Sequence, residues 1–282
     1  MPDSVSVFGL GLMGRPIART LAGKGFPVTG WNRSPLAADL IQGIPKAQLL
    51  EDAARSGVCL LILGDSDAVD AVLAQLQRHL RSGQLVLDMG TSDPARSKAH
   101  AARLAARGVG WVDAPVSGGP EGASAGTLAI MAGGTKDHVA QVKPILNALG
   151  GNVVHVGGAG AGHTAKIINQ LVVGLTIEAV AEALVLADRS GLDPALVQQA
   201  LRGGFADSKV MQIHGTRMIK RDYTPGGKAR TQLKDLRMAL RLAEAARLTL
   251  PHLTSVASRY QQLVDQGHGD LDHSAIHKLL MG

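Results

Sequence analysis

The chain has few cysteines and few aromatic residues, and each shortage excludes a kind of protein. Cys59 is its only cysteine, so no intramolecular disulfide can form and no zinc site can be built from cysteine pairs. Aromatic residues make up 2% of the sequence, although the net charge is +6. Because no basic stripe is interleaved with aromatic residues, we expect no nucleic-acid partner. The positive charge favours small anionic ligands instead.

The sequence also lacks a targeting segment and an uninterrupted apolar run of membrane length. Residues 1–4 carry no basic side chain and lead directly into an apolar segment, so we expect no signal peptide. The most apolar stretch, residues 171–187, contains Glu178 and Glu182, which favours a buried helix over a membrane span. With its single cysteine in an apolar run, the chain is expected to be cytoplasmic and without a membrane partner.

Hydrophobic residues make up 45% of the 282 residues, enough to bury a sizeable core. Up to about residue 158, short apolar segments alternate with stretches suited to helices. This alternation predicts an α/β fold with a doubly wound sheet and helices on both faces. The expected strands are residues 5–8, 27–31, 58–63, 85–89, 111–114, 128–131 and 153–156.

Beyond residue 162 the pattern changes to helix almost throughout. Residues 164–189 contain one glycine and no proline, and they would form a helix of roughly 40 Å, long enough to join two domains. We therefore expect a domain of residues 1–160 followed by an all-helical domain of residues 161–282, with the joint in the glycine-dense segment 157–162. Further helices are expected to begin at Asp193-Pro194, near Asp207-Ser208, near Thr231, at Pro251 and near Asp272.

A glycine loop lies where the first expected strand passes into a helix. Its residues Gly9, Gly11, Leu12, Met13 and Gly14 have the G-x-G-x-x-G spacing of a Rossmann-type dinucleotide site. Gly9 allows the tight turn, Gly11 allows close approach of a pyrophosphate, and Gly14 allows the helix to pack against the strand. The free N–H groups at the start of the helix favour an anion there.

The second expected strand ends in Asn32, Arg33 and Ser34, about 20 residues after the glycine loop. A carboxylate at this place would bind the ribose 2′-hydroxyl of NAD and repel a 2′-phosphate, whereas a guanidinium can clamp the phosphate. The sequence therefore predicts NADP(H) as the cofactor. Leu63 ends the third expected strand and Thr91 follows the fourth, and we assign both to the same cofactor site.

A second glycine-rich segment, residues 113–128, contains Ser117, Gly118 and Gly119. A hydroxyl and successive glycine N–H groups just beyond a strand can cradle a carboxylate. The crevice beyond the strand ends is also where open α/β sheets bind ligands. We assign these three residues to a small carboxylate substrate.

The start of the long helix places Lys166, Asn169 and Gln170 on one face, with Gly162 and Ala165 leaving room beside them. A lysine on an otherwise apolar face needs a partner or a ligand, because burying a lone ammonium is unfavourable. Such a lysine can become a proton donor to a carbonyl oxygen.

Two charged segments in the helical half are less informative alone. Lys234 and Asp235 are neighbours, and adjacent residues of a helix are not expected to pair across one face. Residues 267–273 contain His268 and His273 among aspartates, but the segment is typical of a loop and a helix cap, so we expect no metal.

In order and spacing, the four motifs 9–14, 113–128, 160–170 and 232–236 resemble those of the β-hydroxyacid dehydrogenase family, and the resemblance covers essentially the whole chain. It implies that Lys166 is the catalytic acid and base and that Ser117-Gly118-Gly119 binds the substrate carboxylate. It also implies that Lys234 and Asp235 close over the nicotinamide end of the cofactor. Imine reductases share this fold but usually replace the lysine.

Gln170 stands where most members of the family have asparagine, and together with Asp272-His273-Ser274 it resembles the branch that reduces tartronate semialdehyde to D-glycerate. The threonate dehydrogenase branch also has glutamine there. Gly227 replaces an aromatic residue that is usual in the branch. Glyoxylate, succinate semialdehyde and 3-hydroxyisobutyrate remain alternative substrates, and a non-catalytic NADP(H) sensor is the alternative outside enzymes. The apolar long helix favours a homo-oligomer.

Overall fold

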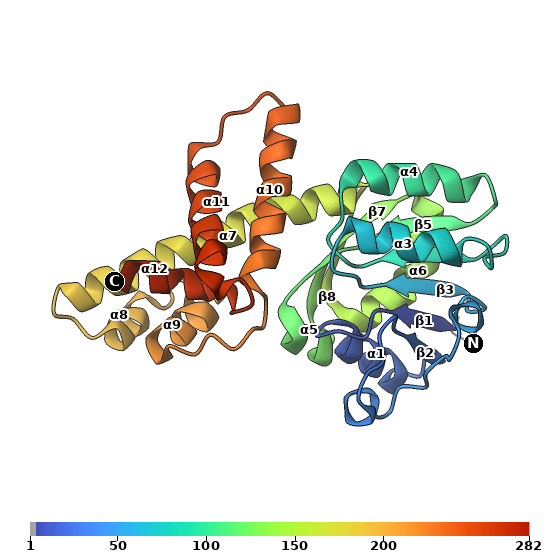
Figure 1. Ribbon diagram of the computed structural model, residues 1–282, viewed down its shortest axis with the longest axis horizontal. Helices are drawn as coiled ribbons and strands as arrows, with labels where there is room; N and C mark the ends of the chain where they lie inside the picture. Colours follow the sequence, from blue (N-terminus) through green and yellow to red (C-terminus); the bar gives the residue numbers. More distant parts are fainter. Residues whose placement is uncertain (1–3, 282) are drawn as a thin grey trace. The chain divides into compact units, whose positions relative to one another are not determined.

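The computed structural model describes residues 4–281. The chain divides into two compact units, Met1–Lys166 and Ile167–Gly282, which are coloured from blue to yellow-green and from yellow to red in Figure 1. The first unit is built on a sheet, whereas the second is helical. The predicted fold class is confirmed, with a Rossmann-type sheet followed by helices.

The sheet of the first unit combines a parallel half with an antiparallel extension. Its order is β2-β1-β3-β4-β5-β7-β6, with β8 beside β7. The neighbours from β2 to β5 run parallel, whereas β7 runs antiparallel to β5 and β6 and parallel to β8. The strands are β1 (Val5–Phe8), β2 (Val28–Trp31), β3 (Val58–Leu61), β4 (Leu85–Asp88), β5 (Gly110–Asp113), β6 (Val116–Ser117), β7 (Leu128–Gly134) and β8 (Gly150–Gly157).

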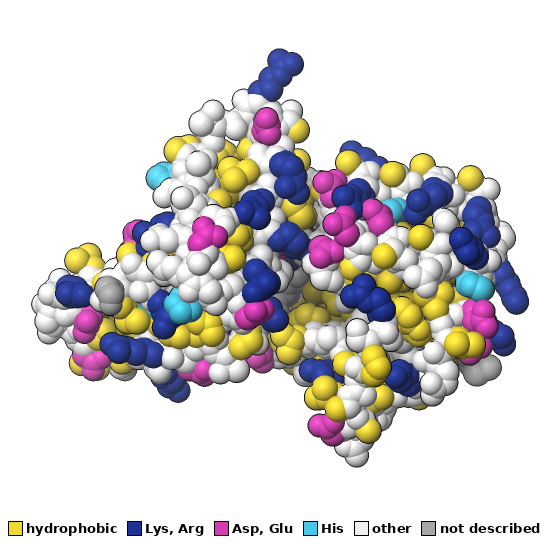
Figure 2. Space-filling view, in the orientation of Figure 1, with side chains coloured by type: hydrophobic (Ala, Val, Ile, Leu, Met, Phe, Trp, Pro, Cys, Tyr) yellow, Lys and Arg dark blue, Asp and Glu magenta, His cyan; other side chains and the backbone are white. Residues whose placement is uncertain are grey.

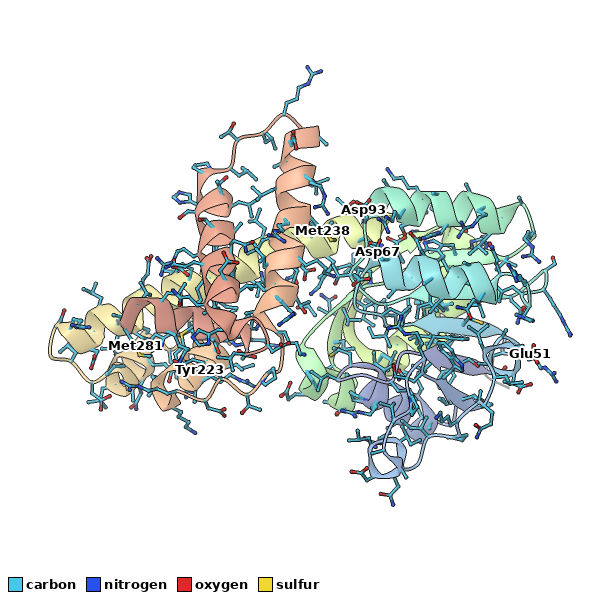
Figure 3. All side chains as sticks on the ribbon, viewed as in Figure 1. Glu51, Asp67, Asp93, Tyr223, Met238 and Met281 are labelled. Atoms are coloured by element: carbon cyan, nitrogen blue, oxygen red, sulfur yellow. The ribbon has the colours of Figure 1, made fainter. Side chains whose placement is uncertain are left out.

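Helices cover both faces of this sheet (Figure 1). They are α1 (Gly14–Gly23), α2 (Leu50–Ala53), α3 (Ser66–Leu76), α4 (Pro94–Ala105), α5 (Gly119–Ala125) and α6 (Lys136–Leu149), with a short 3-10 helix at Ala38–Ile41. The amino ends of α3 and α4 are joined, since the backbone N–H of Asp93 donates to Ser66 Oγ at 2.8 Å. Figure 3 shows Asp67 and Asp93 near these two ends.

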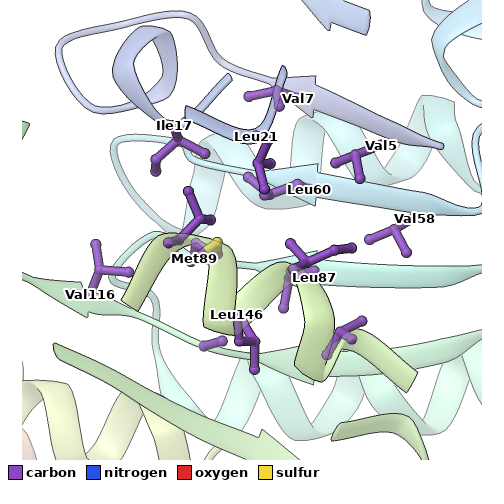
Figure 4. Close-up of a cluster of buried hydrophobic side chains, with 14 of the residues drawn as sticks. Val5, Val7, Ile17, Leu21, Val58, Leu60, Leu87, Met89, Val116 and Leu146 are labelled. Atoms are coloured by element: carbon purple, nitrogen blue, oxygen red, sulfur yellow. The ribbon is translucent and has the colours of Figure 1, made fainter. Parts of the chain in front are cut away.

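Alternation along the strands divides the core of the first unit into two layers. Leu60 packs with Ile17 and Leu21 of α1 and with Leu146 of α6, as the close-up in Figure 4 shows. Its neighbour Cys59 belongs to the other cluster, with residues of α3 and α4. Because successive side chains of a strand point to opposite faces, an all-apolar strand is buried on both sides. Burial also raises the pKa of the Cys59 thiol to about 12.

In the part that the structure describes, the second unit is built of helices joined by loops. Its helices are α7 (Ala161–Arg189, which begins in the first unit), α8 (Pro194–Leu201), α9 (Thr216–Lys220), α10 (Ala229–Ala245), α11 (Pro251–Leu263) and α12 (Lys278–Met281). Short π and 3-10 turns occupy Met211–Gly215, Val264–His268 and His273–His277. The exposed face of α10 carries Arg230, Arg237 and Arg241, and Figure 2 shows dark blue side chains along this helix.

Helix α7 is long and apolar enough to cross a membrane by length and composition, and 39% of its most apolar window is buried within the structure. It nevertheless carries a buried charge, because Glu178 is 8% exposed. Burial raises the pKa of the Glu178 carboxyl, and the nearby Arg259 guanidinium opposes that rise. Glu178 and Arg259 form an ion pair between α7 and α11.

Candidate active site

The glycine loop between β1 and α1 contains two glycines that have no space for a side chain and a third that faces open space. Gly9 has a φ of +100°, and a Cβ there would lie 2.5 Å from the carbonyl oxygen of Ile62. A Cβ on Gly14 would overlap the carbonyl oxygen of Gly9, whereas a Cβ on Gly11 would meet nothing within 4 Å. Gly9 and Gly14 therefore hold the turn closed, and Gly11 leaves its outer surface open to a phosphate.

Asn32 ties this loop to the end of β2. Its Oδ1 accepts from the backbone N–H of Leu10 at 2.9 Å, and its Nδ2 donates to the carbonyl oxygen of Ser34 at 2.8 Å. The sequence predicted Asn32 only as a contact of the cofactor. In the structure it also fixes the relative positions of the glycine loop and the exposed residues Arg33 and Ser34.

A cavity of about 250 Å³ lies at this edge of the sheet. It is lined by six of the predicted cofactor residues, Gly9, Gly11, Asn32, Arg33, Ser34 and Leu63, and by Trp31, Ile62, Gly64, Ala68 and Val72. Glycine N–H groups and a guanidinium suit phosphates, and the apolar side chains suit a flat ring, so the lining fits a dinucleotide. The apolar lining on α3 was not predicted, because Ala68 and Val72 read as ordinary helix positions.

The other predicted cofactor residues of the first unit do not line this cavity. Leu12 is 45% exposed on the glycine loop, Met13 packs against the core, and Thr91 is half-buried after β4. Gly14 packs against the backbone of Gly9 inside the turn and does not line the cavity.

The predicted carboxylate cradle begins on a strand rather than in a loop. Ser117 ends the two-residue strand β6 and is paired with Ala129 of β7. Gly118 and Gly119 follow with φ values of +137° and +67°, and α5 begins there. Only glycine adopts such angles readily, so this turn from strand to helix needs both residues. The first backbone N–H groups of α5, which have no partner within the helix, follow directly from this turn.

The start of α7, which carries Lys166, is attached to the sheet by Asp113. The Asp113 carboxylate accepts from the backbone N–H of Gly160 at 2.7 Å and of His163 at 3.0 Å. A Cβ on Gly162 would overlap the carbonyl oxygens of Asp113 and Met131. The expectation that Gly162 leaves room beside Lys166 was therefore wrong, because this glycine lets the helix approach the strands. Lys166 itself is 7% exposed.

Two buried carboxylates, Asp88 and Asp113, lie around His163, which is fully buried, and neither was predicted to have a role. Asp88 Oδ2 lies 3.5 Å from His163 Nε2, and it also accepts from the Ser92 hydroxyl at 3.1 Å. Burial raises the pKa of the Asp113 carboxyl, and the positive field of His163 and the N–H groups of Gly160 and His163 oppose that rise. These residues hold the helix that bears Lys166, which only the fold reveals because they come from β4, β5 and α7.

In the second unit, the side chain of Gln170 is held by α10. Its Nε2 donates to Asp235 Oδ2 at 2.8 Å and to Gln232 Oε1 at 3.2 Å, and Gln232 Nε2 donates to the backbone carbonyl of Gln170 at 2.9 Å. Asp235 is 1% exposed. The structure thus brings the predicted residues Gln170 and Asp235 together. The preceding residue on α7, Asn169, is half-buried.

Lys234 and Asp235 contradict one expectation. Lys234 Nζ lies 3.3 Å from Asp235 Oδ1, so the two neighbours do form an ion pair. The long lysine side chain reaches around the helix to a carboxylate that is buried and fixed by Gln170. The expectation failed because it considered only short contacts on the helix surface.

Asp272 acts as the predicted cap. Its Oδ1 accepts from the Ser274 N–H at 3.0 Å and the Ser274 hydroxyl at 2.6 Å, and its Oδ2 accepts from the N–H groups of Gly226 and Gly227. Burial raises the pKa of this carboxyl, but hydrogen bonds from His214 and Ser274 and the charge of His273 outweigh it and hold the pKa well below its usual range.

His214, Asp272 and His273 are, within residues 4–281, the group whose ligand atoms could surround a metal ion, all within 4.8 Å of one another. His214 was not part of the predicted segment. The oxygens of Asp272 already accept from backbone and side-chain donors, and Arg217 Nη1 lies 3.3 Å from Oδ2. These contacts satisfy the carboxylate within the protein, which is the role of a cap rather than of a metal ligand.

Two families match the two halves of the chain. Residues 4–157 match the NAD binding domain of 6-phosphogluconate dehydrogenase, and residues 160–280 match the NAD-binding domain of NADP-dependent 3-hydroxyisobutyrate dehydrogenase. The curated protein 2-hydroxy-3-oxopropionate reductase of Escherichia coli K12 is 38% identical over 275 residues, covering 95% of this chain and 94% of that protein.

Solved structures match over the same length. The 3-hydroxyisobutyrate dehydrogenase of Mycobacterium tuberculosis with L-serine has a TM-score of 0.88 and 29% identity, covering 100% of both chains. The protein Psf3, in complex with NADP⁺ and 2-OPP, has a TM-score of 0.90 and 26% identity, covering 98% of this chain and 99% of its own.

The sheet, its glycine loop and these matches define an NAD(P)-dependent oxidoreductase that acts on CH–OH groups. The chain belongs to the β-hydroxyacid dehydrogenase family.

Proposed function

We propose that this enzyme reduces tartronate semialdehyde to D-glycerate with NADPH. The observation that carries the substrate is the 38% identity to 2-hydroxy-3-oxopropionate reductase, which extends over 95% of the chain. Gln170, whose side chain is fixed by Asp235, supports the same branch of the family.

In the proposed reaction, the N–H groups and hydroxyl of Ser117, Gly118 and Gly119 bind the substrate carboxylate. The bound NADPH supplies a hydride to the aldehyde carbon. Lys166 stabilises the negative charge that develops on the aldehyde oxygen and gives it a proton, so the aldehyde becomes a primary alcohol. Asn169 and Gln170 orient the remaining substrate oxygens.

The preference for NADPH is supported by the end of β2. Arg33 and Ser34 line the cavity beside the glycine loop, and no carboxylate occupies this segment to bind a ribose 2′-hydroxyl. Psf3, one of the matched structures, is in complex with NADP⁺. We assign Arg33 to the 2′-phosphate, with Ser34 beside it.

Replacing Arg33 with alanine is expected to weaken NADPH binding about 10- to 100-fold and to change NADH binding less than about twofold. A hydrogen bond to a charged group contributes more than a neutral one, and only NADPH carries the phosphate that would be lost as a partner. The dissociation constants are measured by nucleotide fluorescence. Arg55→Ala is the control, because Arg55 is exposed and pairs with Asp52. Equal weakening of both nucleotides would show that Arg33 is not the clamp.

The function itself is tested by initial rates at 340 nm. Tartronate semialdehyde, glyoxylate, succinate semialdehyde and methylmalonate semialdehyde are each supplied with NADPH and with NADH. The highest kcat/KM for tartronate semialdehyde with NADPH supports the proposal. A preference for another acid would retain the family and reject this substrate, and nucleotide binding without any turnover would favour a sensor.

A further inference from the structure

Two histidine side chains from distant parts of the sequence meet in the second unit. His214 lies on the short turn Met211–Gly215, and His273 begins the turn His273–His277. Their Nε2 atoms are 3.2 Å apart, and the two rings stand almost at right angles. The hydrogen of each ring is placed by the group that the other nitrogen, Nδ1, faces.

His214 Nδ1 faces a carboxylate. This nitrogen is buried and lies 3.4 Å from Asp272 Oδ1. The pKa of the Asp272 carboxyl is held well below its usual range, so the group is ionised and only accepts hydrogen bonds. Nδ1 of His214 therefore carries a hydrogen, because an electron pair there would face a buried negative charge. In the neutral ring the electron pair of the imidazole is then on Nε2.

His273 Nδ1 faces an amide oxygen, Gln232 Oε1, at 3.4 Å. The orientation of this amide is fixed at its other end, where Gln232 Nε2 donates to the backbone carbonyl of Gln170 at 2.9 Å. A carbonyl can only accept, so the nitrogen of Gln232 must lie there and its oxygen must point to His273. Nδ1 of His273 therefore also carries a hydrogen, and the neutral ring again has its electron pair on Nε2.

Two electron pairs at this separation repel each other unless a cation lies between them. Two nitrogen ligands of a tetrahedral zinc ion, each about 2.0–2.1 Å from the metal, lie about 3.3 Å apart. We propose that His214 and His273 bind one divalent metal ion of the zinc type through their Nε2 atoms. Imidazole suits this class of metal, and histidine ligands are usually oriented by an acceptor at the other nitrogen, as Asp272 and Gln232 orient these two.

The surroundings of the pair leave room for such an ion. The His214 side chain is 17% exposed, so solvent reaches it. A Cβ on Gly227 would lie 3.6 Å from His273 Nε2, and the missing side chain leaves space for the water ligands that complete the coordination. Asp272 remains a cap that holds His214 and is not itself a ligand. The sequence predicted no metal for residues 267–273, which do not include His214. The inference does not depend on the proposed function.

Zinc titration of the EDTA-treated chain, followed by calorimetry, tests the site. We expect His214→Gln and His273→Gln each to weaken Zn²⁺ binding at least about 10-fold, as the loss of a ligand should cost no less than the loss of an orienting partner. His252→Gln is the matched control, because the chain has ten histidines and His252 is exposed on α11. Zn²⁺ should raise the melting temperature of the native and control proteins and not of the other two.

Co²⁺ gives a second reading that needs no variant. Bound to the native chain, it should show the visible absorption of a tetrahedral ion, and Zn²⁺ should displace it. Its unpaired electrons should also shift the NMR signals of the His214 and His273 rings more than those of the other histidines. Equal Zn²⁺ affinity in all four proteins would overturn the inference, because the ion would then bind elsewhere. A native chain that binds neither metal would also overturn it, and a proton would then bridge the two rings.

Discussion

Replacing Lys166 with alanine is expected to lower kcat for aldehyde reduction by about 10²- to 10⁴-fold, the usual contribution of a positioned proton donor. Lys166 is 7% exposed, near the start of a helix that Asp113 fixes to the sheet. The cavity with the glycine loop does not include Lys166, so the dissociation constant for NADPH should change less than about twofold. Stopped-flow reduction and nucleotide titration separate the two quantities.

Lys166→Arg separates the loss of the proton donor from the loss of the positive charge. Arginine keeps the positive charge, but its guanidinium does not give up a proton at neutral pH, so kcat should also fall about 100-fold or more. Lys143→Ala is the control, because Lys143 lies on the exposed face of α6. A Lys166→Ala protein that melts normally and retains near-native kcat would remove this lysine from the mechanism.

The parts of the fold that the sequence predicted are those whose signal lies in consecutive residues. An apolar run such as residues 58–61 is a strand buried on both faces, and Asp193 with Pro194 marks the start of α8 through a cap to Ala195. The strand β6 was not predicted, because two residues give no periodicity. The antiparallel direction of β7 relative to β5 is likewise absent from any local pattern.

The site residues likewise fall into those that a local pattern predicts and those whose contacts only the fold reveals. Gly9 and Gly14 were interpretable because the G-x-G-x-x-G spacing lies in nearly consecutive residues, whereas the contact of Gly9 with Ile62 appears only in the structure. Gln170 meets Asp235 across 65 positions, and Asp113 meets His163 across 50. A single sequence contains no signal for such long-range pairs. The partner of Gln170 could therefore be identified only from the packing of α7 against α10.

Asp272→Asn is expected to lower the free energy of unfolding at pH 7 by about 2–4 kcal/mol, the cost of disrupting a buried, multiply bonded carboxylate. Asp272 is fully buried and accepts from Gly226, Gly227 and Ser274. Asparagine has one acceptor oxygen where aspartate has two, and its amide hydrogens would face the N–H groups of Gly226 and Gly227. Urea unfolding, followed by circular dichroism, measures the difference.

The same carboxylate predicts how that difference depends on pH. The folded pKa of Asp272 lies well below its usual range, whereas in the unfolded chain an aspartate titrates near about 3.9. A lowered pKa stabilises the fold above the unfolded value, and the stabilisation is lost as the pH falls from there towards the folded pKa. The gap between native and Asp272→Asn proteins should therefore be constant from pH 8 to about 5 and shrink below about pH 4.

The exposed neighbour Asp270 provides the control for both measurements. It pairs with Lys228 and Arg230 on the surface, where solvent screens the charges, so Asp270→Asn should change unfolding little at any pH. If Asp272→Asn were equally mild, the backbone turn at Gly226 and Gly227 would hold without the carboxylate. A gap that stayed constant down to pH 3 would instead show that the N–H groups bind the protonated acid as well, and that charge does not stabilise this turn.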